Sequence, residues 1–193
     1  MSDTWNFNKG FDGLKKDNIG NEIFFKECLL DMNYSEVIID EDDKVHGYLF
    51  GVTGRKSVNP LMTGIRTFAF LMWGFYHYLV GSFGQRKTAW LRLKETIELT
   101  EALEEQRRNS DGYVNLFFVG SSLRGQGWGK KLMTNYQERC LEVGVKRLYL
   151  WTDKGCNYKF YDHNGFTRII EISSPGLAEY GYEPNGFAYT KLL

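Results

Sequence analysis

The apolar and polar positions of this chain predict a sheet of strands with helices packed against it. The run 113–119 (YVNLFFV) is aromatic and β-branched, as expected of a buried strand, and a glycine-rich, basic stretch follows at 120–131. Residues 132–143 then carry apolar side chains at helical steps of four, four and three: Leu132, Tyr136, Cys140 and Val143. Gly144 is expected to end this helix in a left-handed conformation.

A second strand is predicted directly after that helix, at 145–152. Because side chains alternate along a strand, one face is expected to carry Leu148, Leu150 and Thr152, and the other Tyr149 and Trp151. A strand, a crossover helix and a strand of this length imply that the two strands are parallel neighbours in one sheet.

The flanking segments predict one more helix and four more strands. Residues 22–32 have helical spacing. Strands are expected at 35–39, 44–51, 167–172 and 187–192. We interpret the four acids at 40–43 as a solvated hairpin tip rather than a metal site. Residues 1–20 contain no clear strand, so that Thr4 to Phe7 is either a weak edge strand or no strand at all.

The long segment 55–110 predicts two helices between the early hairpin and the strand at 113–119. The first, 61–81, is about as long and apolar as a membrane span, but it contains Arg66 and His77, which favours a helix packed in the protein or at an interface. The second is amphipathic with a charged back, and its apolar face is marked by Trp90, Leu93, Ile97 and Leu103.

Composition limits the partners and the compartment. The 193 residues (22.5 kDa) fit a single domain, 1–193, with the helical pair as an insertion over 58–108. The chain has 24 basic and 24 acidic residues, so no overall field favours nucleic acid or an anionic membrane. Three widely spaced cysteines predict neither a disulfide framework nor a zinc site. The polar N-terminus lacks a signal-peptide pattern, and a cytoplasmic location is expected.

The turn at 124–131 (RGQGWGKK) is suited to an anion. The first amides of a helix have no partners inside it, and the helix dipole adds about half a positive charge there. Glycines at 125, 127 and 129 would let a ligand approach these amides, and Arg124, Lys130 and Lys131 add positive charge. A pyrophosphate is the anion that fits best. The alternative is a tight strand-to-helix turn that is glycine-rich without binding anything.

Two common phosphate-binding motifs do not match this turn. A Walker loop requires Lys and then Ser or Thr after its last glycine, whereas Gln126 and Gly127 follow Gly125. A dinucleotide fingerprint that starts at Gly125 requires glycine where Lys130 stands.

The pattern that remains is Arg-x-x-Gly-x-Gly, formed by Arg124, Gly127 and Gly129. Together with the strand before it and the segment 156–166 (CNYKFYDHNGF), it resembles the GNAT superfamily of acyl-CoA-dependent N-acyltransferases. The resemblance covers the middle and the last third of the chain. It implies an α/β (α+β) fold with a mixed central sheet flanked by helices, acetyl-CoA as the cofactor, and direct transfer of its acetyl group to a primary amine of a small molecule or peptide. The two-helix insertion is longer than the link usual in this fold.

The resemblance also implies roles for individual residues. The cofactor is expected to contact the strand end, the turn and the last helix, through Phe118, Val119, Arg124, Gly125, Gln126, Gly127, Trp128, Gly129, Lys130, Asn157 and Phe160. Backbone amides around Phe118 and Val119, where the two parallel strands should part, are expected to polarise the thioester carbonyl. Asn157 is expected to hydrogen-bond the pantetheine arm or to cap the last helix.

Proton transfer requires an acid and a base. Tyr161 is the expected proton donor to the leaving thiolate, because a phenol pKa of about 10 exceeds a thiol pKa of about 8.5 by only about 1.5 units. Asp153, just past the second parallel strand, is the carboxylate expected to act on the amine, although the sequence does not settle this role. We interpret Cys156 as a small buried thiol rather than a nucleophile, because direct transfer needs no acyl-enzyme.

Other roles stay open from the sequence alone. The loop 173–186 offers Tyr180, Tyr182 and Glu183 to the acceptor pocket, and the helical pair is hypothesised to form a lid or a homodimer surface beside it, or to fill the core. A non-catalytic CoA-binding sensor on the same fold is the alternative function, and a membrane-associated protein built on 61–81 is a third. The acceptor, the acyl chain and the oligomeric state cannot be read from the sequence.

Overall fold

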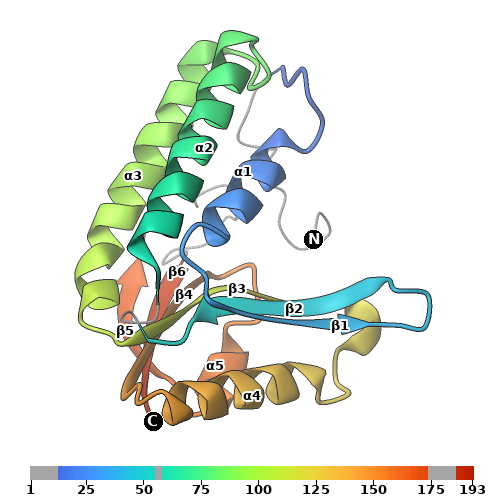
Figure 1. Ribbon diagram of the computed structural model, residues 1–193, viewed down its shortest axis with the longest axis vertical. Helices are drawn as coiled ribbons and strands as arrows, with labels where there is room; N and C mark the ends of the chain where they lie inside the picture. Colours follow the sequence, from blue (N-terminus) through green and yellow to red (C-terminus); the bar gives the residue numbers. More distant parts are fainter. Residues whose placement is uncertain (1–12, 55–57, 174–185) are drawn as a thin grey trace.

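The computed structural model describes residues 13–54, 58–173 and 186–193, which form a six-stranded mixed sheet with helices on both faces (Figure 1). The strand order is β1-β2-β3-β4-β6-β5. The strands are β1 (Tyr34–Ile39), β2 (Val45–Val52), β3 (Gly112–Val119), β4 (Arg147–Asp153), β5 (Thr167–Ile172) and β6 (Gly186–Leu192). Of the described neighbours, β3 and β4 alone run parallel, so the predicted mixed sheet and its parallel pair are confirmed.

The helices divide between the two faces of the sheet. One side carries α1 (Ile19–Cys28), α2 (Pro60–Leu79) and α3 (Arg86–Arg108), and the other α4 (Trp128–Glu142) and α5 (Lys159–His163) (Figure 1). A short 3₁₀ turn, η3 (Ser121–Leu123), links β3 to α4. The predicted two-helix insertion before the central strand is confirmed as α2 and α3. Asn59 caps α2 by accepting hydrogen bonds from two backbone amides, and Pro60 follows as a favourable first residue.

The two faces of β4 build two different cores. Leu148 and Leu150 pack with Leu132, Tyr136 and Cys140 of α4, whereas Tyr149 and Trp151 pack on the opposite side near Leu103 of α3. This is the alternation predicted from the sequence. Trp151 is partly buried, and each of the others, which are buried, contributes about 1.5–3 kcal/mol through burial.

The end of α4 differs in one respect from the prediction. Gly144 has a φ of 80°, as expected of a left-handed residue after the helix. Val143, however, is the C-cap and remains 39% exposed, so it does not belong to the apolar stripe. The helix ends at Glu142, and the next buried apolar side chain is that of Val145, whose amide donates to the carbonyl of Cys140 at 2.9 Å.

The parallel strands β3 and β4 separate soon after they meet. Their register pairs Gly112 with Leu148 and Tyr113 with Tyr149, and no later pair joins them. Each strand nevertheless continues with its outer neighbour, β3 with β2 as far as Val119 and β4 with β6 as far as Asp153. The parting of the strands implied by the family resemblance is therefore present, with backbone groups turned toward the gap between them.

Some predicted boundaries move and some segments lie outside the described residues. The helix predicted at 22–32 is α1, which begins at Ile19 and ends at Cys28. After α1, the side chain of Asn33 accepts a hydrogen bond from the amide of Thr53 at 2.8 Å, just before the start of β1. The weak strand considered at 4–7, and the loop residues Tyr180, Tyr182 and Glu183, lie outside the described residues.

The insertion forms a helical hairpin that extends well beyond the sheet (Figure 1). None of the residues of α2 is buried, and in α3 only Leu103 is. The prediction that Trp90, Leu93 and Ile97 share a packed face with Leu103 is therefore wrong: Trp90 is 63% exposed, because that end of α3 lies too far from the sheet to reach the core. Neither α2 nor any other described helix is long and apolar enough to cross a bilayer.

Candidate active site

The glycine-rich turn delivers the N-terminus of α4 without a capping side chain. Gly127 is the N-cap with a φ of 83°, and Gly125 has a φ of 78°, a region that other residues adopt only with strain. A Cβ on either glycine would meet no atom within 4 Å, so backbone conformation rather than crowding explains them. The amides of residues 128–130 have no partner inside the helix and no side-chain cap, and they are suited to an anion.

Gly129 has a different reason for lacking a side chain. A Cβ there would lie 3.4 Å from a ring carbon of Phe117, 3.6 Å from one of Phe160 and 3.7 Å from Val119. The first turn of α4 thus packs against both β3 and α5. This contact joins the turn, the end of β3 and the helix that carries Tyr161 into one site.

Basic and polar side chains surround the turn. Lys130 is exposed, and the ammonium of Lys131 lies 5.1 Å from the ring centre of Trp128. Arg124 donates from Nε to the carbonyl of Val119 at 3.2 Å, and Gln126 donates to the carbonyl of Ser122 at 2.8 Å. The turn therefore combines uncapped amides with positive charge, which fits the diphosphate of coenzyme A.

The register of β2 and β3 decides which amides face the gap beyond β3. The amide of Gly120 donates to the carbonyl of His46 on β2 at 2.7 Å. Backbone groups alternate in direction, so those of Phe118 also point to β2, whereas those of Phe117 and Val119 point toward the gap. Of the two residues expected to offer an amide there, Val119 is the one so oriented.

Tyr161 lies against the end of β3. Its buried ring is surrounded by those of Phe117, Phe160, Phe166 and Tyr189, with centroids 5.5–6.5 Å away. Burial, and then the nearby Cys156 and Asp153, raise the pKa of Tyr161 above its ordinary value. The phenol therefore holds its proton at neutral pH. His163, two residues on, is exposed and points elsewhere.

Asp153 holds the turn between β4 and α5. Its carboxylate accepts hydrogen bonds from the amide of Cys156 at 3.0 Å and from the thiol of Cys156 at 3.1 Å. Cys156 is half-buried rather than fully buried. Asn157 is exposed, and Tyr158 stands at the N-cap of α5 without a side-chain cap, so the capping role considered for Asn157 is absent.

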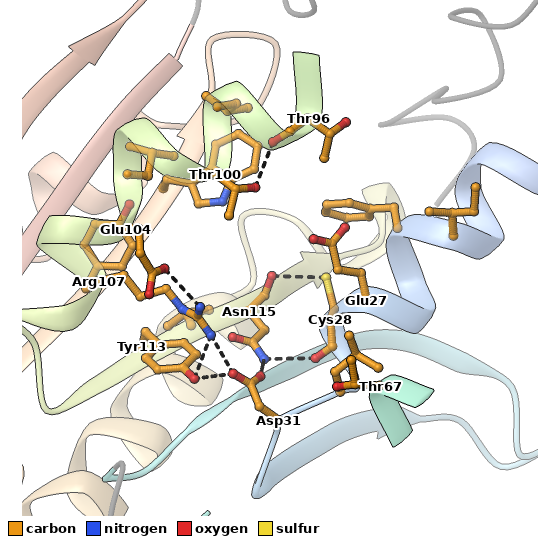
Figure 2. Close-up of a pocket in the computed structure, with 18 of the residues that line it drawn as sticks. Glu27, Cys28, Asp31, Thr67, Thr96, Thr100, Glu104, Arg107, Tyr113 and Asn115 are labelled. Carbon is orange, nitrogen blue, oxygen red and sulfur yellow. Dashed lines mark hydrogen bonds and ion pairs between the residues drawn. The ribbon is translucent and has the colours of Figure 1, made fainter. Parts of the chain in front are cut away.

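A cavity of about 450 Å³ lies between the helices α1, α2 and α3 and the strands β3 and β4. Val114 and Asn115, where β3 leaves β4, and Trp151 of β4 belong to its wall. Apolar surface predominates in the lining. Six lining residues are charged: Glu27, Asp31, Arg92, Glu95, Glu104 and Arg107. Figure 2 shows Glu27 and Asp31 on the α1 side facing Glu104 and Arg107 of α3.

Sequence reasoning missed this cavity. The residues of α3 that line it recur at helical spacing: Arg92, Thr96, Leu99, Leu103 and Arg107. This inner stripe is partly polar, whereas the apolar Trp90, Leu93 and Ile97 face solvent. The sequence pattern that could have indicated the cavity is this second stripe of α3, which combines threonine, leucine and charged residues at helical spacing.

A polar network holds the floor of the cavity in place (Figure 2). The carboxylate of Asp31 accepts hydrogen bonds from Arg107 at 2.6 Å, from Asn115 at 2.9 Å and from the hydroxyl of Tyr113. The guanidinium of Arg107 also lies 4.4 Å from the ring centre of Tyr113. Asn115 further donates to the carbonyl of Cys28 at 2.9 Å. The ends of α1 and α3 are thereby fixed to β3.

The cavity wall also changes the acid–base behaviour of one carboxylate. The Glu27 side chain is exposed to solvent where it lines the cavity. Protein atoms around it still desolvate its carboxylate and raise the pKa of Glu27; Arg107 opposes this effect and Asp31 adds to it. Among the described residues, Glu27 has no ion-pair partner, whereas the other lining carboxylates each contact an arginine.

Comparison with known proteins gives the family. Residues 15–166 match the model of the Acetyltransferase (GNAT) family, so the chain belongs to this family of acetyltransferases. The acetyl donor of the family is acetyl-CoA. No curated protein is significantly similar to the chain.

Solved structures of acetyltransferases resemble this fold at low identity. One is a GNAT-family acetyltransferase from Staphylococcus aureus, with 15% identity, a TM-score of 0.45, and coverage of 82% of this chain and 66% of that chain. Another, from Bacillus cereus, has 13% identity, a TM-score of 0.48, and coverage of 93% and 95%. A third, from Bacillus anthracis, is in complex with acetyl coenzyme A and has 11% identity, a TM-score of 0.45, and coverage of 84% and 63%.

Proposed function

We propose that this protein transfers the acetyl group of acetyl-CoA to a primary amine, with the two substrates meeting where β3 and β4 part. The observation that carries this proposal is the arrangement on the two faces of the sheet. The uncapped start of α4 lies on one face, and the acid-lined cavity lies on the other. Val114 and Asn115 of the parted strand line the cavity, and Val119 of the same strand packs at the turn.

In this proposal the turn holds the diphosphate of the cofactor. The amides of residues 128–130 donate to its oxygens, and Arg124, Lys130 and Lys131 balance its charge. Phe160 and Asn157 border the path of the pantetheine arm. Bound acetyl-CoA supplies a thioester whose carbonyl the outward amide of Val119 polarises.

Two proton transfers complete the proposed reaction. Tyr161 donates its proton to the leaving thiolate, a role supported by its position on α5 against Phe117 of β3. On the other side, an ammonium group with a pKa of about 10.4 must lose a proton, which costs about 4.6 kcal/mol at pH 7. A carboxylate is needed for this step; the sequence favours Asp153, which lies at the end of β4.

In this proposal the helical hairpin of α2 and α3 acts as a lid over the acceptor side of the site. Residues of both α2 and α3, such as Thr67 and Thr100, contribute to the cavity wall. The insertion therefore encloses the acceptor side of the site, where exclusion of water strengthens the interactions inside.

The test is thiol release from acetyl-CoA, followed with a thiol reagent, while alkylamines, arylalkylamines, polyamines, aminoglycosides and peptide amines are offered in turn. Amine-dependent release and an amide product supported by mass spectrometry would agree with the proposal. If coenzyme A binds but no amine in any class releases thiol, the proposal is wrong and the non-catalytic CoA-binding alternative replaces it.

A further inference from the structure

The cavity between α1, α3 and the parted strands holds an unbalanced negative charge. It has four carboxylates against two arginines. Arg92 contacts Glu95 at 3.1 Å, and Arg107 contacts both Asp31 and Glu104. Glu27 alone among these carboxylates has no arginine within ion-pair distance in the described residues. Glu104 also pairs with Arg108, outside the cavity, at 2.9 Å, so Glu27 is the one negative charge of the cavity left without a cationic partner among the described residues. A single positive charge on a ligand would balance it.

The rest of the wall is suited to an apolar body. The apolar lining residues are Phe24 of α1, Leu30 just after it, Leu99 and Leu103 of α3, and Trp151 of β4. A ligand with several ammonium groups would place its additional charges against these side chains, where losing water is not compensated. A ligand with one ammonium group on a hydrocarbon or aromatic body meets both requirements.

A buried hydroxyl without a partner also belongs to this wall. Tyr149 is 3% exposed, and its hydroxyl makes no hydrogen bond in the described part of the protein. Burial raises the pKa of Tyr149, while Arg107 lowers it and Glu104 raises it by smaller amounts. Buried hydroxyl groups are normally hydrogen-bonded, so this one is an unsatisfied polar group within the wall, although the oxygen itself is shielded from solvent.

We propose that this cavity binds the acceptor as a primary monoamine on a compact apolar body, and that Glu27 is the carboxylate that removes its proton. This inference rests on the proposed amine acetylation. One proton passes from the ammonium nitrogen to Glu27, and the neutral nitrogen forms a bond to the thioester carbon. The carbon–sulfur bond breaks, the thiolate takes a proton from Tyr161, and the nitrogen loses its second proton, which restores Tyr161. The net products are the amide, the free thiol and one proton.

The charged and titratable groups around Glu27 belong to three elements besides its own. Cys28 lies on α1 and Asp31 in the segment that follows it; Arg92, Glu95, Glu104 and Arg107 lie on α3, Tyr113 on β3 and Tyr149 on β4. The raised pKa of Glu27 brings it closer to that of an amine than an exposed carboxylate would be, which suits a base. Asp153, by contrast, does not line the cavity, and both of its oxygens bind Cys156.

The substrate class is tested with steady-state thiol release from acetyl-CoA at pH 7.5. We expect kcat/KM for the best of hexylamine, phenethylamine and cyclohexylmethylamine to exceed that of spermidine, putrescine and kanamycin by about 10-fold or more, since an unpaired charge is poorly tolerated in the cavity. If a polyamine or aminoglycoside is the best acceptor, the inferred class is wrong while the proposed function stands. If no amine releases thiol, the proposed function itself fails.

The role of Glu27 is tested with Glu27→Gln beside Asp153→Asn and Glu98→Gln, using the best amine. Glu98 is the control: it is a glutamate of α3 that does not line the cavity and pairs with Lys94. We expect Glu27→Gln to lower kcat by about 10²-fold at pH 7, and to recover toward pH 10 as the free amine deprotonates. Glu98→Gln should match the wild type. Two results would overturn the assignment. One is a pH profile of kcat for Glu27→Gln that matches the wild type. The other is that the fall in kcat toward low pH disappears in Asp153→Asn and in no other variant. Calorimetric titration of acetyl-CoA confirms that each variant still binds the cofactor.

Discussion

The guanidinium of Arg107 lies 2.6 Å from the carboxylate of Asp31, 76 residues away in the sequence. This contact ties the end of the inserted helix α3 to the segment that follows α1. Tyr113 of β3 donates to the same carboxylate and lies under the same guanidinium. The insertion is therefore connected to the sheet at the point where β3 begins to leave β4.

Removing this guanidinium should destabilise the protein. In Arg107→Leu, Asp31 and Tyr113 lose a charged partner, and we expect the free energy of unfolding to fall by about 1–3 kcal/mol. Chemical denaturation followed by circular dichroism measures the change. The matched control is Arg108→Leu, next in the chain and paired with Glu104 on the surface, which should change stability by less than about 0.5 kcal/mol. Equal losses in both variants would contradict this account of the network.

The hydroxyl of Tyr136 should contribute measurably to the core. It donates to the carbonyls of Val52 and Tyr113 at 2.9 and 3.0 Å, where β2 and β3 meet under α4. In Tyr136→Phe these buried acceptors lose a donor, and we expect a loss of about 1–2 kcal/mol. Tyr34→Phe, whose hydroxyl donates to Glu36, is the control and should lose less. Thermal or chemical unfolding of the two variants distinguishes them.

Glu27 should lower the stability of the free protein at neutral pH. Its folded pKa is raised, so the folded state binds its proton more tightly than the unfolded state does, and stability falls as pH rises through the window above the ordinary carboxyl pKa. Glu27→Gln removes this penalty and should raise the melting temperature at pH 7, by an amount that shrinks toward pH 4. Scanning calorimetry at both pH values checks this, with Glu98→Gln as the control. A lower melting temperature at pH 7 would contradict it.

Tyr161 should be needed for turnover and not for cofactor binding. Tyr161→Phe removes the proposed proton donor, and we expect kcat to fall by about 10²-fold while the Kd for coenzyme A stays within about twofold. Because burial raises the pKa of Tyr161, kcat of the wild type should show no decline from its ionisation up to about pH 10. Tyr158→Phe, in the same segment, is the control. Unchanged kcat in Tyr161→Phe would remove the residue from the mechanism.

The strands of the sheet and the glycine-rich turn were predicted well, because residues close together in the sequence determine them. Gly144 ends α4 in the left-handed conformation expected of it, and the alternation over 148–151 divides the two cores as predicted. The N-terminus of α4 is uncapped because Gly127 has no side chain to cap it. These features depend on neighbours in the sequence, so the sequence reveals them.

The acceptor side could not be predicted in the same way. Whether Trp90 or Arg92 of α3 faces inward depends on where the hairpin crosses the sheet, and periodicity alone favoured the apolar residue. Glu27 looked like one more polar position on α1, and its place in a cavity follows from α3 approaching over 60 residues later. The role of Tyr113 in binding Asp31 likewise arises only from tertiary packing.

The central claim is that the amides at the start of α4 hold the diphosphate of coenzyme A. The most direct measurement is calorimetric titration of coenzyme A into the wild type, Gly127→Ala and Gly144→Ala. Both glycines have nearly the same positive φ, 83° and 80°, and lie at opposite ends of α4, so both substitutions introduce similar backbone strain. We predict a Kd raised by about 10-fold or more in Gly127→Ala alone, because the displaced amides lose charge-assisted hydrogen bonds. Equal affinity in the three proteins, or no binding to the wild type, would contradict the claim.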